Sequence, residues 1–120
     1  MTIKIKSIVN KEETFDKLEI RLGRIISIED AANAPKQAYL IKVDFGKFGI
    51  KQTVGRFTNH SKENLKDKMV LGILNFEPRE IGSNLSEFLL LGVQYPKAES
   101  GEATIITPLL IETKIGGKLF

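Results

Sequence analysis

The chain has 120 residues, of which 42% are hydrophobic and 28% charged, so it has the length of one domain with its own core. It contains no cysteine and one histidine, which excludes disulfides, thiolate metal sites, cysteine nucleophiles and multi-histidine metal sites. The net charge of +3 is weakly basic, and no apolar run approaches the ~20 residues of a membrane span. We expect a single domain over residues 1–120, located in the cytoplasm, with no metal and no cofactor.

Alternation of apolar and polar residues predicts a first strand over residues 18–29. Gly23 lies within it, and a glycine inside a strand commonly marks a bend or bulge. A second alternating segment, 39–45, ends at the glycines of a tight hairpin over 46–49. The returning strand is predicted over 50–57.

Residues 59–68 are the only polar stretch with helix signals, and Ser61 is a suitable N-cap for a helix of one or two turns. Residues 69–74 are apolar at both parities, which predicts a strand buried on both faces. A connection is expected over 77–84 and a strand over 85–94. Three other features complete the pattern: a further strand over 104–110 interrupted by Pro108, and two terminal extensions.

Short strands with turn signals and one small helix indicate an all-β fold, a closed or nearly closed barrel. A bent first strand that pairs at both ends, with the helix between the third and fourth strands, is typical of the five-stranded Greek-key OB-fold. Fold alone does not determine function.

The basic side chains are concentrated between Lys36 and Arg56, where five of them accompany one acidic residue, Asp44. A surface that meets a polyanion is expected to include this segment. The alternative is a solvated face of lysines that favours solubility.

No pattern of residues indicates catalysis. No serine lies in a Gly-x-Ser-x-Gly frame, and the segment 116–118 lacks the first glycine and the final serine or threonine of a phosphate-binding loop. His60 lies in a polar loop, where a capping or exposed role is the simpler interpretation. We therefore expect a binding protein that is not an enzyme.

Three segments resemble the tRNA-binding domain family in their order and spacing: IRLGRI at 20–25, YLIKVDFG at 39–46, and the stretch from Asn75 to Gly92. Residues 49–52 and 113–116 add a likeness to its CsaA branch of small, stand-alone, export-related chaperones. The resemblance covers about residues 16–117, and its most specific part is the segment 75–92.

The resemblance implies an OB-fold core over about residues 16–95, with extensions 1–15 and 96–120 that form a symmetric homodimer. It implies two ligands, tRNA and unfolded preproteins, of which tRNA is our first expectation; no DNA specificity is expected. A third interpretation is a docking module for an aminoacyl-tRNA synthetase. A peptide would need an apolar groove, for which the leucines at 89–91 supply side chains.

Binding of tRNA requires cations at phosphate spacing and polar or flat groups that meet exposed bases. The candidate site residues are the cations Lys42, Lys51, Arg56 and Arg79, the hydrogen-bonding Asn75, Ser86 and Glu87, and the stacking residue Phe88, with Phe57 as a second stacking candidate. Each group also has a structural interpretation: the phenylalanines in the core, Asn75 at a strand end, Arg79 paired with Glu80 or Glu87, and Ser86 bonded to a backbone group.

Overall fold

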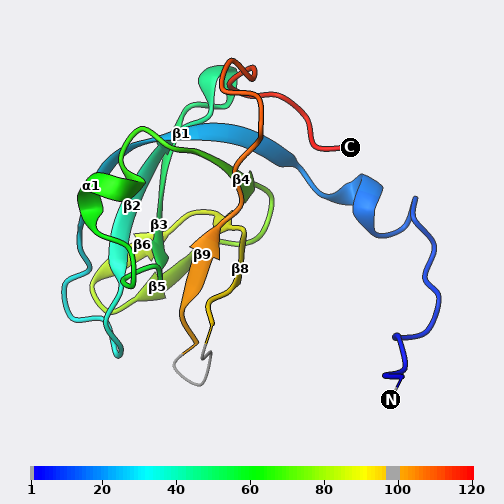
Figure 1. Cartoon of the computed structure of the whole chain (residues 1–120), viewed down its shortest axis with the longest axis horizontal. Helices are drawn as coiled ribbons and strands as arrows, with labels where there is room; N and C mark the ends of the chain where they lie inside the picture. The colour runs from blue at the N-terminus through cyan, green and yellow to red at the C-terminus, as the bar shows by residue number, and fades with distance from the viewer. Residues whose placement is uncertain (1, 97–100) are drawn as a thin grey trace.

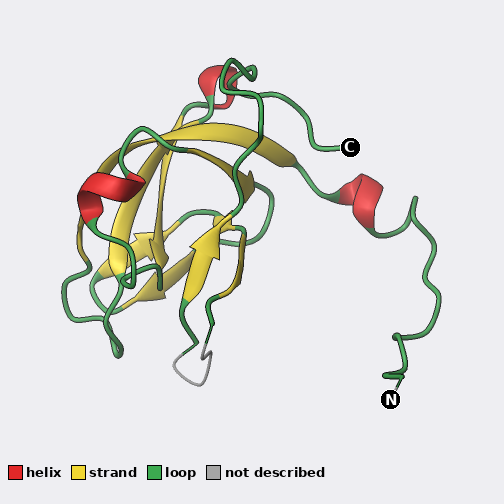
Figure 2. Ribbon diagram, in the orientation of Figure 1, coloured by secondary structure: helices red, strands yellow, loops and turns green. Residues whose placement is uncertain are grey.

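The computed structural model describes residues 2–96 and 101–120, which are mostly strands arranged around one apolar core (Figure 1). Five strands form an antiparallel sheet in the order β3-β2-β1-β4-β7, which curves into a nearly closed barrel (Figure 2). These strands are β1 (Ile20–Asp30), β2 (Tyr39–Asp44), β3 (Ile50–Gly55), β4 (Met69–Ile73) and β7 (Leu89–Leu90). The predicted all-β class and five-stranded OB-type barrel are confirmed.

Strand β1 bends and serves two neighbours. Its first half pairs with β4 and its second half with β2, and Arg24 belongs to both ladders. The register with β2 shifts between Ile25 and Ser27, which is a β-bulge. Ile25, which precedes the shift, is completely buried, whereas Ile26 is only partly buried. The irregularity therefore lies just after the position predicted from Gly23, and Gly23 itself pairs regularly with Val70 of β4.

The core is centred on Phe45, which is completely buried and meets the ring of Phe88 edge to face, with the ring centroids 5.0 Å apart. Two glycines make room for these rings. A methyl group on Gly72 would lie 2.8 Å from atoms of both rings, and one on Gly23 would lie 2.8 Å from Phe45. Close approach of the backbone to the Phe45 ring therefore depends on residues without a side chain.

Helix α1 (Lys62–Leu65) lies between β3 and β4, as predicted. It has one turn, and the Oγ of Ser61 accepts a hydrogen bond from the backbone N–H of Asn64 at 3.1 Å, so the predicted N-cap is confirmed. Leu65 points into the core and is buried. The tight hairpin between β2 and β3 is also present, as the 3-10 turn η2 (Gly46–Phe48).

The segment after β4 differs from the prediction of a connection over 77–84 and one strand over 85–94. It forms four short strands, β5 (Arg79–Ile81), β6 (Asn84–Ser86), β7 and β8 (Gly92–Gln94). Gly82, with φ at 63°, permits the two-residue turn that makes β5 and β6 a hairpin. The long strand is divided because β6 pairs with β5, β7 with β4, and β8 with β9 (Ala103–Ile105). β9 is the shorter counterpart of the strand expected over 104–110.

The barrel closes between β3 and the β6–β7 segment through side chains. The Glu87 N–H donates to the carbonyl of Gln52 at 2.8 Å, and the Gln52 N–H donates to Oε1 of Glu87 at 2.9 Å. The Ser86 Oγ lies 2.9 Å from the Thr53 Oγ1 and accepts from the Val54 N–H at 3.2 Å. Side-chain and backbone hydrogen bonds thus replace a regular ladder at this seam, and further bonds run from the Gln52 amide to the Leu85 carbonyl and from the Thr53 hydroxyl to the Phe88 carbonyl.

The C-terminal extension packs on the start of β1, whereas the N-terminal extension only leads into it. The Leu22 N–H donates to the carbonyl of Gly117 at 2.9 Å, and the Leu119 N–H donates to that of Ile20 at 3.1 Å. On the other side, residues 2–14 lie outside the barrel and lead into the 3-10 turn η1 (Phe15–Lys17) (Figure 1). The C-terminal segment is therefore packed on the barrel of the same chain, whereas the N-terminal segment is not packed on that barrel.

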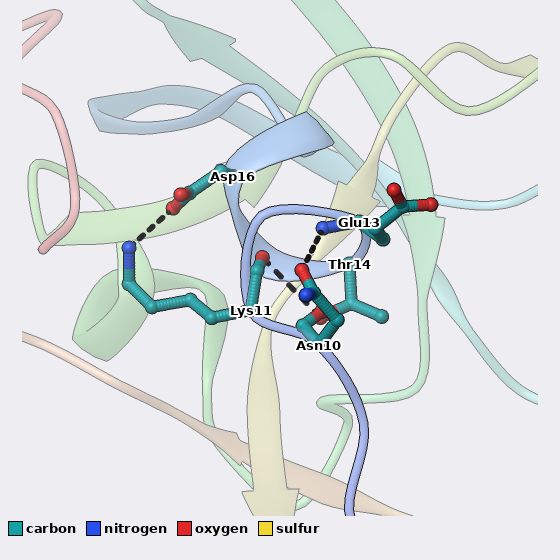
Figure 3. A network of polar contacts seen from close by, with 5 residues as sticks. All are labelled: Asn10, Lys11, Glu13, Thr14 and Asp16. Carbon is teal, nitrogen blue, oxygen red and sulfur yellow. Dashed lines mark hydrogen bonds and ion pairs between the residues drawn. The ribbon is translucent and has the colours of Figure 1, made fainter.

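A small polar network shapes the turn before η1 (Figure 3). The Asn10 Oδ1 accepts from the Glu13 N–H at 3.0 Å, and the Thr14 hydroxyl donates to the Asn10 carbonyl at 2.7 Å. The Lys11 ammonium lies 2.7 Å from Oδ1 of Asp16. The network orders the entry to β1, although an exposed pair of this kind contributes only about 0–1 kcal/mol.

The expected extensions 1–15 and 96–120 include Met1 and residues 97–100, which lie outside the described residues. Within residues 2–96 and 101–120, no helix has the length and apolar character needed to cross a membrane.

Candidate functional site

Three hollows follow one another along β3, and a fourth, of about 350 Å³, lies between the end of β3 and the β7–β8 segment. The central groove encloses about 320 Å³ between β3 and the β5–β6 hairpin. The loop-side hollow encloses about 230 Å³ between β3 and the loop that joins β1 to β2. The end hollow encloses about 210 Å³ beside the start of β3. Val54 and Ile81 line both the central groove and the loop-side hollow, so these two adjoin.

The lining of each hollow mixes apolar and charged side chains. The central groove is lined by Thr53, Val54, Phe76, Glu77, Arg79, Ile81, Ser86, Phe88 and Leu89. The loop-side hollow is lined by Ala34, Pro35, Lys36, Ala38, Val54, Arg56 and Ile81. The end hollow is lined by Lys42, Ile50, Lys51, Gln52 and Glu87.

The four predicted cations all border these hollows. Arg79 is exposed at the central groove, Arg56 is partly buried at the loop-side hollow, and Lys42 and Lys51 flank the end hollow. Lys36, which the sequence suggested only as part of the basic segment, joins Arg56. The fold thus brings cations that are up to 43 residues apart in sequence to one face along β3, from Lys36 to Arg79.

The guanidinium of Arg79 is available for a ligand. Among the described residues, no ion pair joins it to Glu80 or Glu87, so the pairing suggested as an alternative is absent. The Glu87 carboxylate instead accepts from the backbone N–H of Gln52. Arg79 therefore presents its full charge to the central groove, whereas Glu87 is engaged in closing the barrel.

Ser86 performs the structural role suggested as its alternative. Thr53 is buried, and its hydroxyl donates its only proton to the carbonyl of Phe88 at 2.8 Å. The Thr53 oxygen is then the acceptor for the Ser86 hydroxyl, while Ser86 accepts from the Val54 N–H. The hydrogen-bonding capacity of Ser86 is thus used mainly inside the protein, although its side chain borders the central groove.

The two aromatic candidates for base stacking lie in the core. Phe88 is 4% exposed and Phe57 is 3% exposed, and both belong to the apolar cluster around Phe45. Their burial favours the core interpretation of both residues, and Phe88 also lines the central groove. Burial of Phe88 is decided by its contact with Phe45 across the barrel.

Asn75 lies just after β4 and binds the chain that enters β1. Its Oδ1 accepts from the Glu19 N–H at 2.8 Å, and its Nδ2 donates to the Lys17 carbonyl at 2.8 Å. Asn75 does not line any of the three hollows. The structure therefore separates it from the other candidates and gives it the strand-end role that the sequence left open.

Phe76 was missed by the sequence analysis. Its side chain is 46% exposed and lines the central groove together with Arg79. The signal available in the sequence was weak: Phe76 follows the alternating strand 69–74 and precedes Pro78, which places it outside the core pattern. An exposed aromatic beside an exposed arginine is a common feature of surfaces that bind nucleic acid.

Glu102 was also missed. It is 5% exposed, and its Oε1 accepts from the Thr58 hydroxyl at 2.9 Å and from the Asn59 N–H at 3.2 Å. Its Oε2 lies 3.2 Å from the Arg56 guanidinium, which also donates to the Gln37 carbonyl at 3.3 Å. A buried carboxylate thus holds Arg56 in place.

Among residues 2–96 and 101–120, no group of three acidic or histidine side chains is arranged as a metal site.

Residues 20–113, most of the chain, match the family described as "Putative tRNA binding domain". The chain belongs to the tRNA-binding domain family. The family predicted from the sequence segments is confirmed. The matched region contains the barrel, the β5–β6 hairpin and all three hollows of this tRNA-binding domain.

Relatives of this tRNA-binding domain include methionine–tRNA ligases. The ligase of Pyrococcus horikoshii is 34% identical over 109 residues, and that of Thermococcus onnurineus is 32% identical over 109 residues. In both cases the match covers 91% of this chain and 14% of the ligase. The tRNA-binding domain therefore spans about one seventh of the ligases' length.

Solved structures similar to this domain include CsaA chaperones. The CsaA chaperone protein from Picrophilus torridus is 30% identical with a TM-score of 0.84, and the match covers 94% of this chain and 100% of that one. The CsaA chaperone from Bacillus anthracis is 29% identical with a TM-score of 0.84, covering 95% and 100%. A MetRS-related protein from Pyrococcus horikoshii, 20% identical with a TM-score of 0.79, shares the fold.

Proposed function

We propose that this domain binds tRNA through the face along β3, and that it does so without catalysis. The observation that carries the proposal is the position of Lys42, Lys51, Arg56 and Arg79, four cations on one hollowed face of a tRNA-binding domain. Neutralising several phosphates supplies most of the affinity for RNA and makes it depend on salt. Concave apolar surface between the cations meets the flat faces of unpaired bases.

A filter-binding comparison of total tRNA with an unfolded preprotein at physiological salt tests the proposal. We expect tRNA to be retained, and its affinity to fall steeply between about 50 and 200 mM salt. Retention of the preprotein alone would contradict RNA binding and favour the chaperone function.

Binding of unfolded preproteins is the second candidate. Leu89 is 47% exposed and borders the central groove with Val54 and Ile81, so the face along β3 offers apolar contacts to an extended peptide. Two of the similar solved structures are described as CsaA chaperones. A docking role beside a synthetase is a third candidate, since the same domain forms 14% of the methionine–tRNA ligases.

The homodimer belongs to the same proposal. Ile3, Ile5 and Ile8 in the N-terminal extension and Leu109 and Ile111 near the C-terminus are more than four-fifths exposed. Apolar side chains exposed on the two extensions are suited to be covered in a second copy. Sedimentation at micromolar concentration should give twice the chain mass of 13.4 kDa, and a mass near 13.4 kDa would refute the dimer. A cytoplasmic location stays a prediction.

A further inference from the structure

Phe76 differs from the other phenylalanines of the barrel. Phe45, Phe57 and Phe88 are buried in the core, whereas 46% of Phe76 is exposed inside the central groove. An exposed aromatic ring loses the stabilisation that burial would give it. When such a ring lines a groove, it indicates a surface that a ligand can cover. The position offers a flat apolar face to a ligand that enters the groove.

The backbone around Phe76 is held firmly. The preceding residue, Asn75, is bound to the chain entering β1 through both Glu19 and Lys17. Two residues later, Pro78 restricts the chain, and β5 starts immediately after it. The ring is therefore carried by a short segment fixed at both ends, which reduces the entropy lost when a ligand packs on it. Asn75 acts here as a positioning residue.

The chemistry around Phe76 suits a nucleobase better than a phosphate. Val54, Ile81 and Leu89 make the groove wall apolar, and the Glu77 carboxylate at its edge disfavours an anion while it can accept a hydrogen bond from a base amino group. Arg79 supplies the cation that an adjoining phosphate needs. Proteins bind single-stranded nucleic acids with this combination of aromatic and cationic groups.

The loop-side hollow continues the groove. It shares Val54 and Ile81 with the central groove and is bordered by Lys36 and Arg56. Two adjoining hollows, each with an apolar floor and a cation at the edge, match two successive bases with phosphates outside them. Bases in a duplex are stacked and paired, so they cannot enter such hollows.

We propose that the central groove and the loop-side hollow take two consecutive unpaired nucleotides of the RNA, with Phe76 as the stacking platform for one base. This inference rests on the proposed tRNA binding and specifies the part of the RNA that the site recognises. A duplex stem contacts only the cations along β3 in this arrangement.

The chain has no tryptophan, so Phe76→Trp places a single indole in the groove. Titration with tRNA or with a single-stranded oligonucleotide should quench its fluorescence, whereas an RNA duplex of the same length should not. Equal quenching by the duplex would overturn the requirement for unpaired bases. Phe76→Ala should weaken tRNA binding about 5- to 100-fold, as loss of one stacked base does, and Phe76→Tyr should retain most of it.

Leu85→Ala is the matched control, because Leu85 is 44% exposed on β6 and lines none of the three hollows. Its tRNA affinity should equal that of the unaltered protein, and all variants should unfold at the same denaturant concentration. If the unaltered protein does not bind tRNA, the proposed function fails. If it binds and Phe76→Ala binds equally well, the stacking platform fails alone. Loss of preprotein binding in Phe76→Ala with unchanged tRNA affinity would assign the groove to a peptide and also overturn the inference.

Discussion

The guanidinium of Arg56 lies 3.2 Å from Oε2 of Glu102, and Glu102 is almost completely buried. This ion pair joins the end of β3 to the segment that enters β9, so a cation of the candidate RNA face is also part of the tertiary structure. Arg79, at the other side of the same face, is exposed and forms no ion pair among the described residues. The two arginines should therefore respond differently to substitution.

Arg56→Ala should weaken tRNA binding and also lower the free energy of unfolding by about 1–3 kcal/mol, because it leaves a buried carboxylate with fewer partners. Arg79→Ala should weaken tRNA binding with a change in unfolding free energy within about 0.5 kcal/mol. Urea denaturation and filter binding on the same samples measure both effects. Equal stability of the two variants would show that the pair with Glu102 contributes little.

The salt dependence of tRNA binding should change when one phosphate contact is removed. For Arg79→Ala, the slope of log affinity against log salt should decrease in magnitude by about 1, as expected for one lost phosphate contact. Affinities measured at several salt concentrations between about 50 and 200 mM give this slope. An unchanged slope with a weaker affinity would mean that Arg79 contacts a base or sugar instead.

The barrel seam should depend on the hydroxyl groups of Thr53 and Ser86. Thr53→Val removes the donor to the buried Phe88 carbonyl and the acceptor for Ser86, which should cost about 1–3 kcal/mol of unfolding free energy. Thr53→Ser keeps both bonds and serves as the control with a smaller loss. Ser86→Ala should cost about 1 kcal/mol, and its effect on tRNA affinity should be small. A large loss of affinity with unchanged stability would place Ser86 in contact with RNA.

Asn75→Ala should lower the unfolding free energy by about 1–2 kcal/mol, because the Glu19 N–H and the Lys17 carbonyl each lose a partner. The tRNA affinity should fall less than in Phe76→Ala, since Asn75 acts only by holding the neighbouring segment. Thermal or chemical denaturation measures the first effect and filter binding the second. The opposite ranking of affinities would indicate a direct contact between Asn75 and RNA.

Gly23→Ala should destabilise the barrel by about 2–3 kcal/mol, because the added methyl group would meet the Phe45 ring in a packed core. Gly49→Ala tests a different effect: its methyl group would meet nothing within 4 Å, but the backbone at φ 87° and ψ −178° lies in a region that only glycine adopts readily, at about 1–3 kcal/mol. Denaturant midpoints compare the two. A Gly23→Ala variant as stable as the unaltered protein would contradict the packing argument.

Local patterns were sufficient for much of the barrel. Alternation located β1 to β3 and a run apolar at both parities located β4, each within a few residues. The glycines located the hairpin at η2, and Ser61 located the helix cap. The same patterns failed between residues 77 and 94, where four short strands replace one connection and one strand. Pairing in that segment depends on β4, β5 and β9, which are distant partners that a local pattern does not contain.

The all-β barrel, the family and the basic segment can be predicted from the chain alone, because each depends on neighbouring residues or on a motif of fixed spacing. Which side chains line the hollows depends instead on how distant segments pack together. Phe88 and Phe76 are the same amino acid 12 positions apart, yet the ring of Phe88 packs on Phe45 and that of Phe76 lies exposed in a groove. The net charge of +3 is weak, but the fold concentrates cations at the hollows along β3.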